Sequence, residues 1–156
     1  MGQAIGAHYD RIYLRGSNDQ FVTAWIPLGD VPIGMGGITY LEGSQHWGEQ
    51  LEQGHRRSHA QLPQHQRVHP VFEHQQDGGW ISRDLAQLGE RLRSRGLVAN
   101  FQAGDVVLHS PYMIHASTNN DDQEGRIRLS TDLRFQRANT AIDQRWNQHW
   151  SMGDGL

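Results

Sequence analysis

The sequence contains no cysteine, which excludes a disulfide framework and any metal site built on thiolates. It also has no long apolar run and no leader in which charged residues precede an apolar stretch, so neither a membrane span nor a signal peptide is indicated. Neither charge sign is in large excess, because 14 basic and 17 acidic residues give a formal net charge of −3. A nucleic-acid partner is therefore disfavoured, and we expect a soluble, cytoplasmic protein.

The chain is rich in glycine and histidine, with 18 and 10 copies in 156 residues. Several glycines stand where strands would turn, among them Gly29, Gly43, Gly104 and Gly125, which is typical of a β-rich protein. A chain of this length can bury one hydrophobic core but not two. Residues 1–156 are therefore predicted to form a single domain.

Runs of β-branched and aromatic residues between turn signals predict six strands. They fall at residues 21–28, 38–44, 97–102, 105–109, 112–117 and 126–135. The last run alternates, with Arg126 and Arg128 on one face and Ile127 and Leu129 on the other.

Residues 47–96 read as an insertion between strands. The part that contains His55, His59, His65, His69 and His74 shows little periodicity, and a short helix is predicted from Ser82 to about Arg95. Residues 137–156 read as a C-terminal extension.

A metal centre is indicated by residues from the two ends of the chain. Antiparallel strands joined by the loop from Thr118 to Gly125 would bring His115 close to Arg126, and an imidazole beside a guanidinium suits a metal together with a carboxylate ligand. His8 and Asp10 lie at i and i+2, on one side of an extended segment. Two His and one carboxylate form the facial triad of non-haem Fe(II) oxygenases.

These motifs together carry a family resemblance. The segments HYD, TAWIPLGDVP, GGITYLEGS, GDVVLHSPYMIHAS and GRIRLS follow one another in the order seen in the phytanoyl-CoA dioxygenase family of Fe(II)/2-oxoglutarate oxygenases, which the chain resembles over nearly its whole length. The resemblance implies a mostly β fold, a double-stranded β-helix or cupin-like jelly roll. That fold has eight core strands, so the six predicted here imply that the first two are lacking, either in an N-terminally truncated member or in a minimal one. Open sheet edges would then favour self-association.

The resemblance also implies roles for individual residues. His8, Asp10 and His115 would hold the iron, and Arg126, eleven residues after His115, would bind 2-oxoglutarate, with Arg128 as its rival. Ser117 would contact the 2-oxoglutarate carboxylate or simply bond a loop. Trp25 would line the pocket or belong to the core.

The other histidines have competing interpretations. His109 is interpreted as a residue that orients a metal ligand, or as a structural residue, but not as a ligand. His46, in GSQH, stands near the position of a GSH motif that is common in the family. The five histidines of residues 55–74 could suggest zinc, but without Cys or an HExxH motif a solvated loop is the better interpretation.

The implied function is a dioxygenase that hydroxylates a small organic substrate and releases succinate and CO2. Asp10 favours hydroxylation, because related halogenases replace this carboxylate with a small residue. Two alternatives stay open: a catalytically incompetent fragment or binding module of the same fold, and a cupin-type metalloprotein that uses His8, His109 and His115 without 2-oxoglutarate.

Overall fold

The structure is a computed structural model. It describes residues 4–15, 18–63 and 79–142, together with the single residues 144, 149 and 152.

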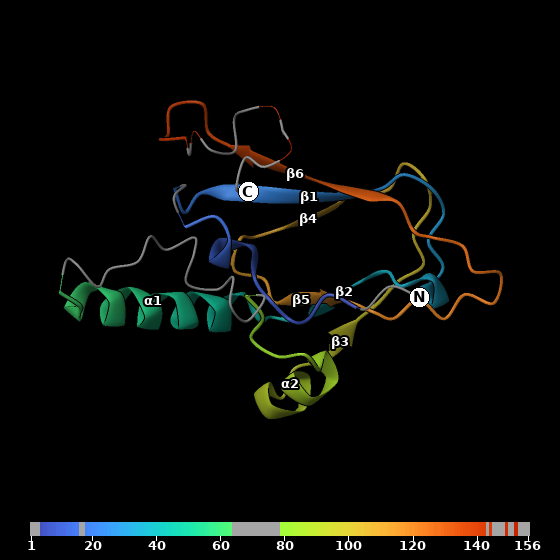
Figure 1. The fold of residues 1–156 in the computed structure, drawn as a ribbon, viewed down its shortest axis with the longest axis horizontal. Helices are drawn as coiled ribbons and strands as arrows, with labels where there is room; N and C mark the ends of the chain where they lie inside the picture. Colours follow the sequence, from blue (N-terminus) through green and yellow to red (C-terminus); the bar gives the residue numbers. More distant parts are fainter. Residues whose placement is uncertain are drawn as a thin grey trace.

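In the described part of the chain, six strands form two antiparallel sheets that lie in two layers (Figure 1). One sheet has the order β4-β1-β6 and contains β1 (Phe21–Pro27), β4 (Val107–His109) and β6 (Ser130–Gln136). The other has the order β3-β2-β5 and contains β2 (Ile38–Leu41), β3 (Gly96–Leu97) and β5 (His115–Ser117). Each predicted strand overlaps one of these, although β3 shares only Leu97 with its prediction and β3, β4 and β5 are shorter than expected. Two facing antiparallel sheets are the arrangement expected for a double-stranded β-helix.

The predicted pairing of the last two strands is wrong. β5 pairs with β2 and β6 pairs with β1, so consecutive strands belong to different sheets. The segment between them crosses from one layer to the other, and β6 begins at Ser130 rather than at Arg126. Arg126 consequently lies in the crossing segment and not beside His115.

The β4-β1-β6 sheet turns its polar side chains inward and several apolar ones outward. In β1, Thr23 and Trp25 are buried on the inner face, whereas Val22 is 42% exposed on the outer face. Val22 pairs with Phe135 of β6, which is 56% exposed. The predicted alternation is therefore present within β6, from residue 130 on, with its polar side facing the interior between the sheets.

Two α-helices accompany the sheets among the described residues. α1 (Gln45–Gln61) was not predicted, and it places His55 and His59 in a helix instead of the expected loop. The other histidines of the 55–74 group lie outside the described residues. α2 (Leu85–Leu92) is shorter than the predicted helix, because Asp84 rather than Ser82 caps it by accepting a hydrogen bond from the Gln87 amide at 2.9 Å.

The N-terminal segment is held between β5 and α1. His8 forms a β-bridge with His115, and the extended backbone then tightens into a 3-10 helix, η1 (Asp10–Ile12), so residues 8–14 are only partly extended as predicted. Tyr9 is buried in a core cluster with Ile12, Leu41 and Ile114.

Glu52 ties α1 to this N-terminal segment. Its carboxylate accepts a hydrogen bond from the Tyr9 hydroxyl at 3.1 Å and lies 3.0 Å from Arg15 Nη2. The side chains of Glu52 and Arg15 are 2% and 4% exposed, so this is a buried ion pair. The residues on both sides of Asp10 are thus anchored to a helix about forty positions later in the chain.

The contact between α1 and the loop before β5 requires glycine at position 48. A Cβ added to Gly48 would lie 2.0 Å from the carbonyl oxygen of Tyr112.

The described residues contain no helix that is long and apolar enough to cross a membrane.

Candidate metal centre

The His8-Tyr9-Asp10 segment turns two potential ligands to one side. Tyr9 has extended backbone angles (φ −126°, ψ 143°), so its side chain points away from those of His8 and Asp10. Burial of Tyr9 against the core therefore fixes the opposite direction for the imidazole and the carboxylate. The prediction that these two residues share a side is confirmed.

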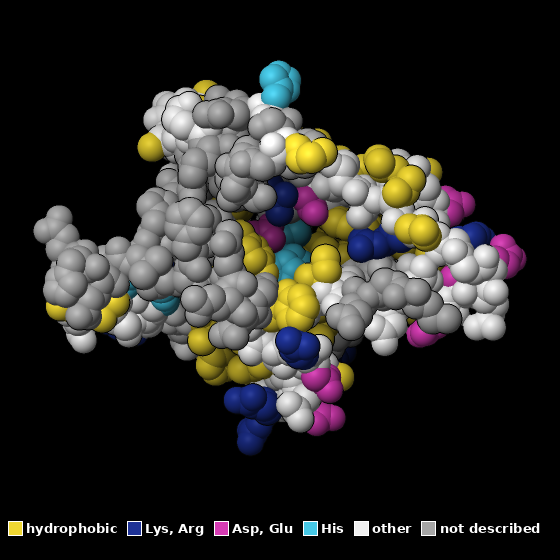
Figure 2. Space-filling model, viewed as in Figure 1, with side chains coloured by type: hydrophobic (Ala, Val, Ile, Leu, Met, Phe, Trp, Pro, Cys, Tyr) yellow, Lys and Arg dark blue, Asp and Glu magenta, His cyan; other side chains and the backbone are white. Residues whose placement is uncertain are grey.

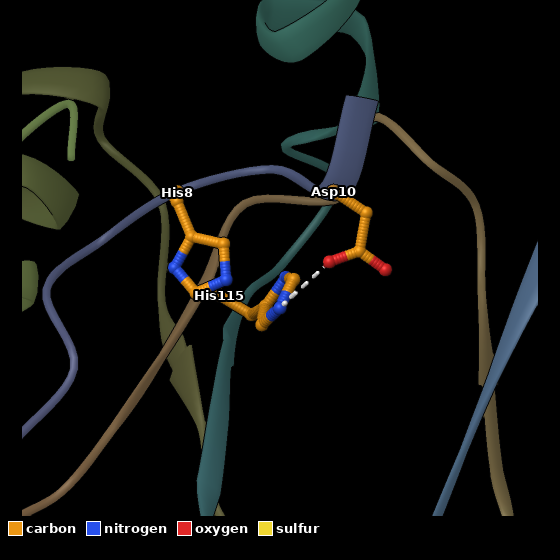
Figure 3. A group of neighbouring side chains, drawn as sticks. All are labelled: His8, Asp10 and His115. Carbon is orange, nitrogen blue, oxygen red and sulfur yellow. Dashed lines mark ion pairs between the residues drawn. The ribbon is translucent and has the colours of Figure 1, made fainter. Parts of the chain in front are cut away.

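His115 completes the group from the neighbouring strand. The backbone amides of His8 and His115 each donate to the other's carbonyl oxygen at 2.9 Å, so the two residues lie directly opposite one another. One ligand atom from each of His8, Asp10 and His115 lies within 4.8 Å of the other two. Figure 3 shows the three side chains converging, with an ion-pair contact of 3.5 Å between His115 Nε2 and Asp10 Oδ1.

Backbone carbonyls orient both imidazoles. His8 Nδ1 lies 2.8 Å from the Gly6 carbonyl oxygen, and His115 Nδ1 lies 2.9 Å from that of Met113. Since a carbonyl oxygen only accepts, each Nδ1 carries the hydrogen, and in the neutral ring each Nε2 keeps its lone pair. Metal-binding imidazoles are commonly oriented in this way.

The electrostatics of the site suit a divalent cation. Burial lowers the pKa of His115 to about 3, reinforced by the nearby His8, and burial also lowers the pKa of His8. Burial alone would raise the pKa of Asp10, but the hydrogen bond from His109, the charges of His115 and Arg134, and the Thr23 hydroxyl together lower it. At neutral pH the group therefore offers two neutral imidazoles and one carboxylate. These donors fit a non-haem Fe(II) ion.

Three polar side chains surround the Asp10 carboxylate. Thr23 donates a hydrogen bond to Oδ2, His109 Nε2 lies 3.2 Å from the same oxygen, and Arg134 Nη2 lies 3.6 Å from it. His109 thus contacts one of the candidate ligands, as its first interpretation requires. The contacts of Thr23 and Arg134 with Asp10 were not predicted. Arg134 lies in β6 and continues the alternation of Arg128, Ser130 and Asp132.

The residues predicted to bind 2-oxoglutarate lie in different surroundings. Arg126 is 53% exposed and pairs with Asp122 at 2.6 Å and Glu124 at 3.4 Å, so the structure does not bring it to the triad. Ser117 accepts a hydrogen bond from the Ile5 amide at 2.6 Å.

Trp25 and Arg128 lie together on the inner side of β1. Trp25 is 2% exposed, packs on Phe101 and has the Arg128 guanidinium 5.7 Å from its ring centroid. Thr23, which contacts Asp10, lies two residues from Trp25 and hence on the same face of the strand.

Comparison with known proteins identifies the family. The model of the phytanoyl-CoA dioxygenase (PhyH) family matches residues 1–127. The chain belongs to this family. Two curated relatives of this PhyH chain are named 1-deoxypentalenic acid 11-beta-hydroxylase. The protein from Streptomyces exfoliatus is 31% identical over 134 residues and that from Streptomyces arenae is 29% identical, covering 85% of this chain and 41% of the relative in both cases. The chain thus spans about two fifths of the length of these relatives.

Solved structures confirm the double-stranded β-helix fold of the PhyH chain. The non-heme alpha ketoglutarate dependent carbocyclase SnoK from nogalamycin biosynthesis is 22% identical, with a TM-score of 0.54, and the match covers 86% of this chain and 44% of that one. The epimerase SnoN, solved with Fe3+, alpha ketoglutarate and nogalamycin RO, is 23% identical, with a TM-score of 0.53, and the match covers 88% and 44%. At these identities the likeness concerns the fold alone.

The PhyH triad is the one group of potential metal ligands among the described residues. His46 is exposed at the start of α1 and packs on Trp47, away from this group. His55 and His59 are stacked one helical turn apart on α1 and do not join it. Figure 2 shows histidine and acidic side chains deep in a hollow near the middle of the face in view, with basic side chains beside them.

Proposed function

We propose that this PhyH chain carries the active site of an Fe(II)- and 2-oxoglutarate-dependent dioxygenase. It would hydroxylate a small organic substrate, with succinate and CO2 as co-products. The observation that carries the proposal is the convergence of two imidazoles and one carboxylate within 4.8 Å. Membership of the PhyH family and the names of the curated hydroxylase relatives support the same reaction class.

The imidazoles and the carboxylate would have different tasks. His8 and His115 would donate Nε2 lone pairs, because their Nδ1 atoms are bound to backbone carbonyls. Asp10 would neutralise one of the two positive charges of the ion. When bound, iron and 2-oxoglutarate supply the activation of dioxygen, and the protein supplies binding, orientation and exclusion of water.

We further propose Arg128, rather than Arg126, as the residue that binds the far carboxylate of 2-oxoglutarate. Arg126 is already neutralised by two acidic neighbours at the surface. Arg128 is half-buried and donates to the Ser130 hydroxyl at 3.0 Å, and among the described residues no carboxylate forms an ion pair with it. A guanidinium shielded from water in this way suits a carboxylate ligand.

Electrostatics support the placement of Arg128 near the triad. Burial lowers the pKa of both His8 and Arg128, and the Asp132 carboxylate opposes the change at both residues. Asp132 pairs with Trp25 across the β1–β6 ladder. The charge of Asp132 thus influences His8 and Arg128 alike, as expected if both side chains border one polar space between the sheets.

Formation of succinate tests the proposal. Purified protein would be supplied with Fe(II), 2-oxoglutarate, ascorbate and oxygen, with 1-deoxypentalenic acid as a first candidate substrate because of the names of its relatives. We expect succinate from the parent, even when turnover is slow and uncoupled from substrate, and none above background from His115→Ala. Equal rates in the two proteins would contradict the proposed function.

A further inference from the structure

We propose that His109 and Tyr40 are positioning residues that fix the Asp10 carboxylate in one orientation. In this orientation Oδ2 is bound by the protein and Oδ1 faces the imidazoles. The inference rests on the proposed metal site and adds the residues that determine which carboxylate oxygen is offered to the ion.

The two oxygens of Asp10 have different surroundings. Oδ2 accepts from the Thr23 hydroxyl and lies 3.2 Å from His109 Nε2 and 3.6 Å from Arg134 Nη2. Oδ1 lies 3.5 Å from His115 Nε2, on the side of the candidate ion. Two hydrogen-bond partners and one guanidinium at Oδ2 leave Oδ1 as the atom available to a metal.

The three side chains around Oδ2 form one row across a sheet. Thr23 of β1 pairs with His109 of β4 on one side and with Arg134 of β6 on the other. Their side chains therefore project together from the inner face of the β4-β1-β6 sheet. The opposite sheet provides His115, so Asp10 lies between this row of polar side chains and the candidate metal-binding imidazoles.

His109 is itself oriented from the opposite sheet. Its Nδ1 lies 2.9 Å from the hydroxyl of Tyr40, a residue of β2 that pairs with His115. Because the carboxylate of Asp10 only accepts, His109 Nε2 carries a hydrogen. In the neutral ring, Nδ1 then accepts from Tyr40.

The resulting chain of hydrogen bonds runs from Tyr40 through His109 to Asp10 and joins the two sheets at the site. The His109 side chain is only 2% exposed, so water cannot readily replace it. A buried chain of this kind strengthens each of its bonds and holds a metal ligand in one orientation. We infer that loss of His109 leaves the triad in place but frees the Asp10 carboxylate to rotate.

Binding of Co(II) to the full chain, monitored under argon by the visible absorption of the bound ion, tests this inference. Removal of a residue that orients a metal ligand typically costs 10- to 100-fold in metal affinity. We expect a loss of this size in His109→Leu, together with an altered spectrum. His109→Gln, which keeps an N–H donor of similar reach, should bind within a few-fold of the parent. His46→Gln, at an exposed position, is the matched control and should equal the parent.

Tyr40→Phe provides a second measurement if His109→Leu does not fold. It removes one hydroxyl, and it should weaken Co(II) binding by several-fold while the far-UV circular dichroism stays unchanged. Parent-like affinity and spectrum in folded His109→Leu, or in Tyr40→Phe alone, would overturn the inference. If the parent binds no Co(II), or if His115→Ala binds it equally well, the proposed metal site itself fails.

Discussion

Replacement of Glu52 by Gln would remove one negative charge from the middle of α1 while keeping the size of the side chain. In the parent, the buried carboxylate lies 3.0 Å from Arg15 and 3.3 Å from Arg56, and it accepts from the Tyr9 hydroxyl. Arg56 is 45% exposed and can be solvated, but Arg15 is 4% exposed. The variant would therefore remove the carboxylate that lies against a buried guanidinium.

Removal of one partner of a buried ion pair costs about 3–5 kcal/mol. Domains of ordinary size have an unfolding free energy of about 5–15 kcal/mol, so a substantial fraction of the stability would be lost. For a chain of this length the midpoint of thermal unfolding should fall by on the order of 10 °C. Because Tyr9 lies between His8 and Asp10, Fe(II) affinity should fall as well.

Urea and thermal unfolding at neutral pH measure this loss. Glu49→Gln, an exposed substitution on the same helix, is the control and should change stability by less than about 0.5 kcal/mol. If Glu52→Gln is as stable as Glu49→Gln, the buried ion pair does not anchor the N-terminal segment as described.

The same pair of proteins tests a pH dependence. Burial alone would raise the pKa of Glu52, but the hydrogen bonds and charges of Arg15, with Tyr9 and Arg56, lower it. A lowered carboxyl pKa stabilises the folded state above the unfolded value of about 4.3, and this contribution is lost as the pH falls through the folded value. The stability difference between parent and Glu52→Gln should therefore be constant near neutrality and shrink below about pH 4. A difference that grows on acidification would contradict this sign.

Three further predictions concern other parts of the molecule. Gly48→Ala should destabilise the protein by about 1–3 kcal/mol in thermal unfolding because the added Cβ would lie 2.0 Å from a backbone carbonyl oxygen, whereas Gly54→Ala on the same helix has no atom within 4 Å and should be neutral or stabilising. Arg128→Ala should weaken 2-oxoglutarate binding, measured by calorimetry with Fe(II) present, at least tenfold more than Arg126→Ala; equal losses would mean that the wrong Arg is assigned. Light scattering should show self-association through the edge strand β6 and its exposed face, reduced by Phe135→Lys, and a monomer at all concentrations would exclude it.

The parts of the fold that local patterns encode were predictable. Most residues of β1 are β-branched or aromatic and lie between turn signals, and its predicted bounds differ from the observed ones by a single residue. His8 and Asp10 share a side because one extended residue separates them. The convergence of His115 with His8 and Asp10 was predictable from the place of His115 in an ordered set of motifs.

Features that depend on distant contacts were not predictable. α1 has few apolar residues, and it is stabilised through Glu52 by Arg15, a residue 37 positions earlier. The choice between Arg126 and Arg128 depends on where the chain enters β6, and the exchange of layers between β5 and β6 is not visible in the alternation of residues 126–135. The row of polar side chains around Asp10 depends on the register of three strands, which a single sequence does not reveal.

Anaerobic titration with Fe(II) in the presence of 2-oxoglutarate tests the central claim most directly, because it detects the metal and its cosubstrate at one site. We predict one Fe(II) per chain and a weak visible charge-transfer band in the parent, and loss of both in His115→Ala, whereas the exposed control His46→Gln should retain them. Binding of Fe(II) by His115→Ala with the stoichiometry and band of the parent would contradict the assignment of His8, Asp10 and His115 as the metal ligands.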